Sequence, residues 1–436
     1  MKLNRLPLSV WVFLIGLLAV GTTEAQEPLS FRQAIELALR HSTEVALSNA
    51  DETHAYQTYV EAHSSYIPQI FVGSNVGYAY GFPLSLEGAA PTLFNVTTQS
   101  TVVNLAQREF VRAAKAEWNV SKSQGRAQRS QVIMDAALTY LDLTRWEERK
   151  RILDSETKVV RDVERSVAAR ISEGIDSRME ETKARLLEAQ TRVHMTEADG
   201  AVDFLRTRLS QLTGLPSSSI KTARESIPAL AESEKQLDTD ATVQSSPSVE
   251  LAEETAIAKQ ALAKGEHKAL YPTADFAAQY GLINTSLTNF QDFFREGSFQ
   301  SHNVTFGLVL RLPLFNATQR ARAAVADADA LRARKEVEQA RNKAALDGIK
   351  ARHNVEELSA ARDVAQLRYD LANGELDATH ARMEAEVATQ RELQNAAIGA
   401  AERSLDRMNA DFELQRAQLE LLRTNGALDQ WALPGN

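Results

Sequence analysis

Two hydrophobic periods alternate along the chain. Between Ser30 and Pro68, apolar side chains recur every three or four residues, which predicts one helix with Ser30 as its N-cap and an end near Pro68. After that proline the period changes to two, and this alternation predicts a strand with one apolar face and one mostly small or polar face. The apolar face of this strand comprises Ile70, Val72, Val76, Tyr78, Tyr80 and Phe82.

The strand leads into much longer helices. A second, weaker strand is expected at 93–104, and a helical stretch from about 106 to 173 follows it. Unbroken, that helix has a length on the order of 100 Å. Gly174 interrupts it, helical spacing resumes behind the glycine, and Gly214 and Pro216 stop the second helix. Apolar steps of three and four along these helices are typical of a coiled coil.

The same order of elements then occurs a second time. A polar connector leads to a helix that ends at a proline, to two strands separated by a polar loop, and to another long helix. Gly374 interrupts this helix as Gly174 interrupts the first, and a further helix continues to about Leu422. The expected division is a leader at 1–25, a first repeat at 26–213, the connector at 214–247, a second repeat at 248–424 and a tail at 425–436.

Each strand has one apolar face and one mostly small or polar face, which indicates that the strands lie in a membrane. A tilted strand of about 9 to 11 residues spans a bilayer with apolar side chains outward and polar ones toward a lumen. Only a closed barrel satisfies every backbone group in lipid, and bacterial barrels need at least about eight strands. The chain must therefore oligomerise to complete a barrel, with its long helices forming a hollow cylinder. We expect a mainly α fold with a transmembrane β-barrel contribution; a periplasmic coiled-coil scaffold or adaptor without a channel is the alternative.

The N-terminus and the composition favour an exported protein. Lys2 and Arg5 precede a short apolar run and small residues at Thr23 and Ala25, as in a secretory signal peptide, with a single membrane anchor as the alternative. The chain has no cysteine, which excludes disulfides, thiol chemistry and a lipidated cysteine. Export without disulfides fits a bacterial periplasm or outer membrane. A net charge of −9 without a Lys/Arg cluster argues against a nucleic-acid partner.

The sequence holds no pattern typical of an enzyme. The eight histidines are scattered without metal-binding spacing, no glycine-rich phosphate loop is present, and the serines have no organised base. We therefore expect neither catalysis nor a metal or other cofactor, and any energy for transport must come from a partner.

Five segments, in order along nearly the whole chain after residue 25, resemble TolC-like outer-membrane efflux proteins (outer membrane factors). They are FRQAIELAL, TYLDLTRWEERKRIL, LSQLTGLP, SVELAEETAIAKQALAKGEHKALYPTADF and LRLPLFNATQRARAAVADA. The resemblance implies a homotrimer in the outer membrane, a passive tunnel of a tripartite efflux or type I secretion system. Each chain would give four strands to a barrel of about twelve strands and its helices to a long periplasmic tunnel. It also implies a periplasmic adaptor (membrane fusion) protein, an inner-membrane pump of the RND, ABC or MFS type, and surrounding outer-membrane lipid as partners.

The chain departs from this family in two respects. The segment VVNLAQRE, at 102–109, stands where the family usually carries a Pro-Leu-Phe-like turn, which the second repeat keeps at 313–315. The bend into the first long helix is therefore expected to differ. Many relatives also carry a lipidated cysteine, and this chain has none.

Gly174 and Gly374 are the expected tips of two helical hairpins. A reversal between helices needs a residue that takes positive φ without strain, as glycine does. In the family such tips carry an apolar residue beside the glycine and dock helical hairpins of the adaptor. The matching positions are Gly174 with Ile175, and Gly374 with Leu376. A turn without a partner is the alternative.

Charged residues near these tips are candidates for gating or ion selection at the tunnel mouth. Threefold repetition of acidic groups forms rings that favour cations, whereas most charges on such helices are simply solvated. The acidic candidates are Asp176, Glu180, Asp377 and Glu384, and the candidates for latching neighbouring helices are Arg170, Arg368 and Tyr369. Glu180, Ala184 and Arg185 match the family's spacing after the first tip, whereas His380 replaces the acid after the second.

Overall fold

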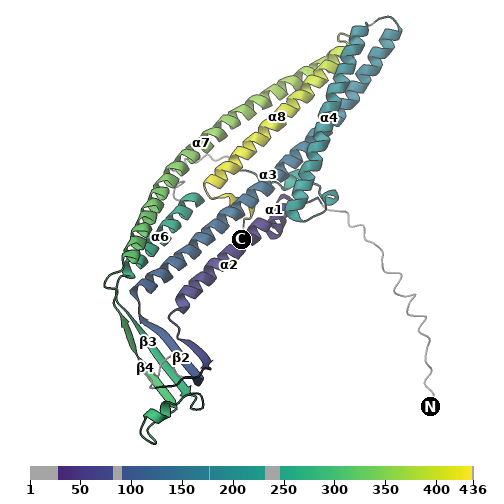
Figure 1. Ribbon diagram of the computed structural model, residues 1–436. Coiled ribbons are helices and arrows are strands. Elements are labelled where there is room, and N and C mark those ends of the chain that lie inside the picture. The colour runs from purple at the N-terminus through teal and green to yellow at the C-terminus, as the bar shows by residue number, and fades with distance from the viewer. Residues whose placement is uncertain (1–27, 82–90, 176, 231–245, 435–436) are drawn as a thin grey trace, which may run out of the picture.

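The computed structural model describes residues 28–81, 91–175, 177–230 and 246–434. The chain is elongated, with a small sheet at one end and helical hairpins at the other (Figure 1). The expected signal peptide at 1–25 and the tip candidate Asp176 lie outside the described residues.

The first half begins with two helices where one was expected. Its elements are α1 (Phe31–His41), α2 (Thr43–Ser64), β1 (Gln69–Asn75), β2 (Thr92–Val103), α3 (Leu105–Ser172) and α4 (Arg178–Thr213). Ser30 caps α1 as expected, because its hydroxyl accepts from the Gln33 backbone N–H while the Gln33 side chain accepts from the Ser30 backbone N–H. The single helix from Ser30 to Pro68 is wrong, because Ser42 has an extended backbone (φ −65°, ψ 120°) and caps a second helix.

β1 is shorter than the strand expected at 70–82. Beyond Asn75 the chain leaves β2, and the Ala79 backbone N–H donates to the carbonyl of Leu287, in the loop after β3, at 3.1 Å. Gly81 has a φ of 114°, which a residue with a side chain rarely adopts. The strand therefore ends at Asn75, although the sequence alternation alone continues past it.

The second half repeats the order of the first. Its elements are α6 (Pro247–Lys268), β3 (Thr273–Ile283), the 3-10 turn η3 (Phe290–Phe293), β4 (His302–Arg311), α7 (Ala317–Glu384), α8 (Gln390–Thr424) and α9 (Leu428–Ala432). The mainly helical fold with two pairs of strands is confirmed. The connector holds two short 3-10 turns, η1 (Ser217–Ser219) and η2 (Arg224–Ser226).

Gly374 does not form a turn, and that expectation is wrong. α7 is continuous from Ala317 to Glu384, so Gly374 and Leu376 lie inside the helix. An interior glycine weakens a helix by only about 1 kcal/mol relative to alanine. This cost is too small to end a helix that packs along its length. The reversal occurs at Glu386 instead, whose φ is 61°.

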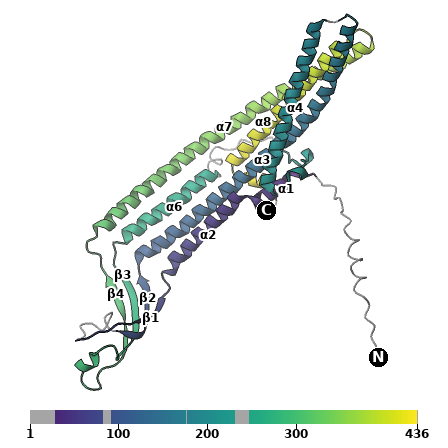
Figure 2. The same ribbon diagram turned by 45° about the vertical axis from the view of Figure 1, so that its right-hand side comes forward.

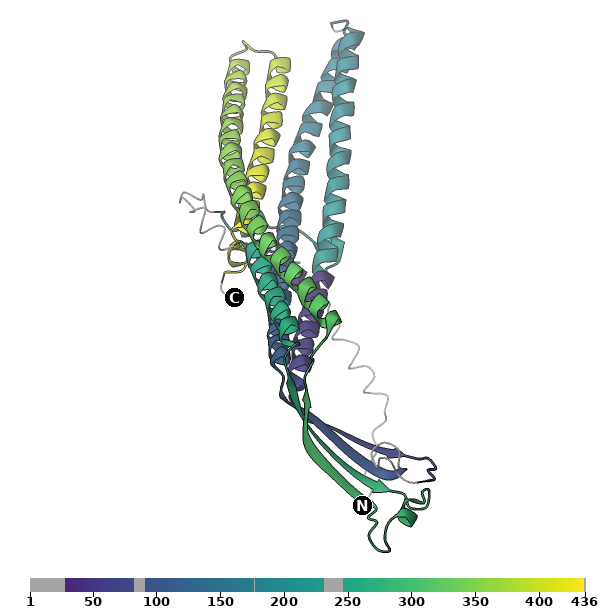
Figure 3. The same cartoon turned by 60° about the vertical axis from the view of Figure 1, so that its left-hand side comes forward.

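The helices form one curved layer (Figure 2). Near the sheet the contacts give the order α2, α3, α6, α7, and toward the tips they give α4, α3, α8, α7. α3 is thus central along its length, whereas α7 lies at one edge and α2 followed by α4 lies at the other. Figure 3 shows the α3/α4 pair and the α7/α8 pair as two separate hairpins toward the tips.

A core forms at mid-length, where the connector meets α1, α3, α4 and α9. Tyr140 of α3 is fully buried there, and its hydroxyl donates to the Leu29 carbonyl at 2.6 Å and accepts from the Ala223 backbone N–H at 2.8 Å. Phe31 packs edge-on against it, with ring centroids 5.4 Å apart. Burial raises the pKa of the Tyr140 phenol. The start of α1 and the connector are therefore fixed to the central helix.

Candidate channel surfaces and hairpin tips

The four strands form one antiparallel sheet, in the order β1–β2–β3–β4, with two chemically different faces. The register places Val72, Val96, Tyr280 and Val304 in one row of the apolar face. The neighbouring row, on the polar face, consists of Phe71, Thr97, Gln279 and Thr305. The alternation expected for the strands is therefore confirmed as a property of the whole sheet.

The apolar face is exposed. On β4 the residues Val304, Phe306, Leu308 and Leu310 are 65–75% exposed, and Ile70 and Val72 of β1 are similarly open. Soluble proteins rarely leave a continuous apolar surface of this kind uncovered. This face requires lipid or another apolar surface against it.

Both edges of the sheet are open. Among the described residues, β1 pairs only with β2, and β4 pairs only with β3. An unpaired edge presents a row of backbone donors and acceptors to which another strand can add. The β1 edge continues into α2 and the β4 edge into α7, which are the two edges of the helical layer.

α7 carries an apolar stripe, here called the α7 seam, on its outward side. It consists of the exposed residues Val364, Leu367 and Leu371 at coiled-coil spacing, and Gly374 continues it. The opposite side of the helix faces α8, because the Arg362 side chain donates to Asp411 at 3.1 Å and the Tyr369 ring lies 4.4 Å from the Arg407 guanidinium. The α7 seam therefore points away from α8, which is the helix that contacts α7 toward the tips.

α4 carries a matching stripe, here called the α4 seam. Met179, Leu186 and Val193 recur every seven residues and are all exposed. The other side of α4 faces α3, since Thr191 is buried and donates its hydroxyl to Glu156 of α3 at 3.4 Å. The two seams lie at opposite edges of the chain.

The two hairpin turns have the same backbone geometry. In the first, Gly174 has a φ of 74° and donates to the Ile171 carbonyl at 2.9 Å, while Ile175 donates to the Arg170 carbonyl at 2.9 Å. This is the left-handed C-terminal turn expected at Gly174. Ile175 is 60% exposed at the end of the hairpin.

The second turn reproduces these bonds without a glycine. Glu386 donates to the Met383 carbonyl at 3.0 Å, and Val387 donates to the Arg382 carbonyl at 2.8 Å. Thr389 then starts α8 with a capping box. Val387 is 77% exposed and occupies the place that Ile175 has in the first turn.

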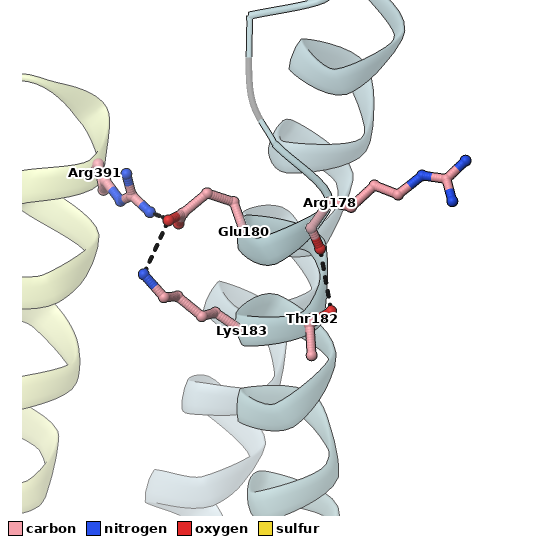
Figure 4. A network of polar contacts seen from close by, with 5 residues as sticks. All are labelled: Arg178, Glu180, Thr182, Lys183 and Arg391. Carbon is pink, nitrogen blue, oxygen red and sulfur yellow. Dashed lines mark hydrogen bonds and ion pairs between the residues drawn. The ribbon is translucent and has the colours of Figure 1, made fainter.

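Glu180 connects the two hairpins (Figure 4). Its carboxylate forms an ion pair with Arg391 of α8 and accepts a hydrogen bond from Lys183 Nζ at 2.9 Å. The Glu180 side chain is only 18% exposed, so it lies between its two cationic partners rather than in open solvent. Arg178 points away from α8 in Figure 4. Of the acidic candidates that lie in the described residues, Glu180 is the one with this contact.

The remaining candidates are spread along the helices. Glu384 ends α7 beside the second turn, with its carboxylate 3.4 Å from His380 Nδ1. Arg368, Tyr369 and Asp377 lie inside α7, farther from the turn than expected. Their roles in latching or gating stay predictions, as does that of Arg170.

Sequence reasoning missed Arg391 and Val387. Val387 follows once Arg382 and Met383 are aligned with Arg170 and Ile171, because the two turns then coincide, whereas no such signal marks Arg391. The Thr389-x-x-Glu392 capping box was the local signal for the second turn.

Within the described ranges, no helix is both long enough and apolar enough to cross a membrane. In the same ranges, no three histidine, aspartate or glutamate side chains gather as metal ligands do.

Comparison with known proteins identifies the fold. No family model and no curated protein sequence matches the chain. The outer membrane protein VceC of Vibrio cholerae matches with a TM-score of 0.74 over 91% of this chain and 96% of that chain, at 15% identity. The CmeC outer membrane channel of Campylobacter jejuni matches with a TM-score of 0.74 over 91% and 86% of the two chains, at 15% identity. The open state of the MtrE outer membrane channel of Neisseria gonorrhoeae matches with a TM-score of 0.72 over 92% and 90%, at 18% identity. The chain has the fold of these outer-membrane proteins.

Proposed function

We propose that this chain, which has the fold of solved outer-membrane channels, is one subunit of a trimeric channel of the TolC-like family in the outer membrane. The sheet carries the proposal, because it combines an exposed apolar face, a polar face and two open edges. In a closed ring the apolar face lies against lipid and the polar face lines a water-filled lumen.

Three copies are the smallest number that leaves an open passage. Two copies supply about eight strands, and side chains fill the interior of a barrel of that size. Three copies supply about twelve strands and a wider lumen. The β4 edge of one copy pairs with the β1 edge of the next, a head-to-tail contact that closes into a ring.

The two seams support the same arrangement in the helical part. A second copy is their occupant, because the seams match in spacing and lie at opposite edges of the chain. Leu186 follows Gly174 by twelve residues, and Gly374 precedes Glu386 by twelve, so both lie at the same height above the tips. In neighbouring copies the large Leu186 then packs over the small Gly374, as knobs pack into holes. This contact gives Gly374 a role inside a continuous helix.

The tips are the proposed docking points for a periplasmic adaptor. Ile175 and Val387 present apolar side chains at the end of the molecule farthest from the sheet. The Glu180–Arg391 ion pair holds the two hairpins together in the resting tunnel, and docking that separates them opens its mouth. An inner-membrane pump supplies the energy, in a tripartite efflux or type I secretion system, and the channel itself conducts passively.

Membrane fractionation and reconstitution test the proposal. The protein is expected in the outer membrane as a heat-modifiable trimer that gives stepwise conductance in planar lipid bilayers. The competing function, a periplasmic coiled-coil scaffold or adaptor, predicts a soluble protein without conductance. A soluble monomer would overturn the channel proposal.

A further inference from the structure

Fixed charge is almost absent from the sheet. In the described strands β1–β4, Asp275 and Arg311 are the only Asp, Glu, Lys or Arg residues. The register places both on the polar face, where the other polar side chains are amides and hydroxyls such as Asn95, Gln99 and Thr305. The polar face is therefore hydrophilic without carrying a charge gradient along its length.

The two charged residues are paired with each other. Asp275 accepts from Arg311 Nη1 in an ion pair across β3 and β4. Asp275 is 5% exposed, whereas the Arg311 side chain is 60% exposed, so the guanidinium lies between the carboxylate and the open face. Burying an unpaired carboxylate is costly, and the pairing with Arg311 offsets part of that cost.

The pair lies at the helical end of the sheet. β3 begins at Thr273, which pairs with Arg311, and β4 ends at Arg311. On the proposed function, on which this inference rests, the location is the junction between the barrel lumen and the helical tunnel. Threefold repetition places three such pairs in a ring around that junction.

We infer that the Asp275–Arg311 pair sets the charge specificity of the channel at the junction between the barrel lumen and the helical tunnel. Because the two charges cancel there, positive, negative and neutral solutes all pass. A ring of carboxylates favours cations and a ring of guanidinium groups favours anions, whereas a ring of closed pairs favours neither. Sorting of substrates by charge then falls to the tunnel and its partners, and the barrel sorts by size.

Single-channel recording on the purified full-length protein in planar bilayers tests this inference. The measured quantity is the K⁺/Cl⁻ permeability ratio under a KCl gradient, relative to the unmodified protein. Arg311→Gln unmasks three carboxylates and is expected to raise the ratio several-fold. Asp275→Asn unmasks three guanidinium groups and is expected to lower it. The double variant Asp275→Asn/Arg311→Gln is expected to return it to the starting value.

The double variant separates charge cancellation from a purely structural role. If the pair only stabilises the sheet, both single variants lose oligomer or conductance without opposite shifts in the K⁺/Cl⁻ permeability ratio. That result overturns the inference. Thr305→Asn, an uncharged change on the same face, is the control and should leave the ratio unchanged; an equal shift there also counts against the inference. If the unmodified protein gives no conductance steps at all, the proposed channel function fails instead.

Discussion

Gly174 and Glu386 occupy the same place in the two hairpin turns, and only one of them is a glycine. Both have positive φ, 74° and 61°, and both close the turn by donating to the carbonyl three residues earlier. The left-handed backbone costs a residue with a side chain roughly 1–2 kcal/mol. Glu386→Gly is therefore expected to stabilise the second turn, and Gly174→Val to destabilise the first.

Amide hydrogen exchange of the full-length protein measures this effect. Exchange around residue 174 should accelerate in Gly174→Val, and exchange around residue 386 should slow in Glu386→Gly. Gly200→Val is the matched control, because Gly200 lies inside α4 with no atom within 4 Å of the added Cβ. Unchanged exchange in Gly174→Val would show that the turn does not depend on the glycine.

Reversing the charge of Arg391 tests the link between the hairpins. Arg391→Glu places a carboxylate against Glu180, and the repulsion is expected to separate the hairpins and raise the open probability of the channel in bilayers. The Arg391 side chain is 60% exposed, so solvent screens the pair and its contribution to stability is about 1 kcal/mol or less; opening is therefore a more sensitive readout than stability. Glu180→Arg in the same chain should restore the closed state. Lys183→Gln, which leaves the Glu180–Arg391 contact intact, is the control, and failure of the double reversal to rescue contradicts the proposed latch.

Exchanging large and small side chains tests the seam between copies. Gly374→Leu places a leucine at the proposed contact with Leu186 of the next copy, and overpacking of this kind costs about 1–3 kcal/mol. The fraction of trimer after detergent extraction should fall, and Leu186→Gly combined with Gly374→Leu should recover part of it. Gln366→Ala, on α7 but outside the seam, should leave the trimer unchanged. Trimers of normal yield in Gly374→Leu would place the interface elsewhere.

Charges at the tips test adaptor docking. Ile175→Asp and Val387→Asp should each reduce crosslinking to the cognate adaptor several-fold, because an apolar contact loses its free energy when it must bury a carboxylate. Both residues are exposed, so the folded chain tolerates the change. Asp377→Ser, nine residues before the turn, should bind normally. Crosslinking that falls in Asp377→Ser but not in Val387→Asp would contradict docking at the turn.

Glu109 gives the joint between α3 and α6 a pH dependence. This buried carboxylate accepts from Lys268 Nζ at 2.6 Å and from Arg112 at 2.9 Å, and the hydrogen bond from Lys268 holds its pKa below the ordinary value of 4.5. A lowered pKa in the folded state means that the stabilisation is fully present above pH 4.5 and is lost as the pH falls through the lowered pKa.

Thermal unfolding of Glu109→Gln against the unmodified protein measures the contribution of Glu109. The unmodified protein should be more stable at neutral pH, and the gap should close below pH 4.5. Glu338→Gln removes an exposed carboxylate on α7 and serves as the control. A gap that stays constant as the pH falls would mean that the ionised form of Glu109 is not the stabilising species.

Local chemistry predicted most of the elements. The N-cap at Ser30, the left-handed turn at Gly174, the helix end at Gly214 and the alternation in the strands are all set by residues close in sequence. Gly374 shows the limit of this reasoning, because a glycine lowers helix propensity without dictating a reversal. The neighbouring helices that pack along the continuous α7 include α6, which is distant in sequence, so the pattern around Gly374 carried no sign of it.

The contact between the hairpins could not be predicted for a similar reason. Glu180 and Arg391 are 211 residues apart, and each lies among other charges of both signs on a helix surface. Nothing in the local pattern distinguishes Arg391 from the arginines around it. Only the alignment of the two turns brings the start of α4 and the start of α8 to the same height.

The exposed apolar face of the sheet also determines how the protein must fold and assemble. On the proposed function, a newly exported chain carries an uncovered apolar sheet with two open edges, which is a template for aggregation in the periplasm. In the proposed trimer the sheet gains its missing hydrogen bonds from other copies, so folding of the strands and association of subunits form one step. Correct association of subunits then competes with misassembly. The rate of subunit supply and protection by chaperones therefore decide how much functional protein a cell obtains.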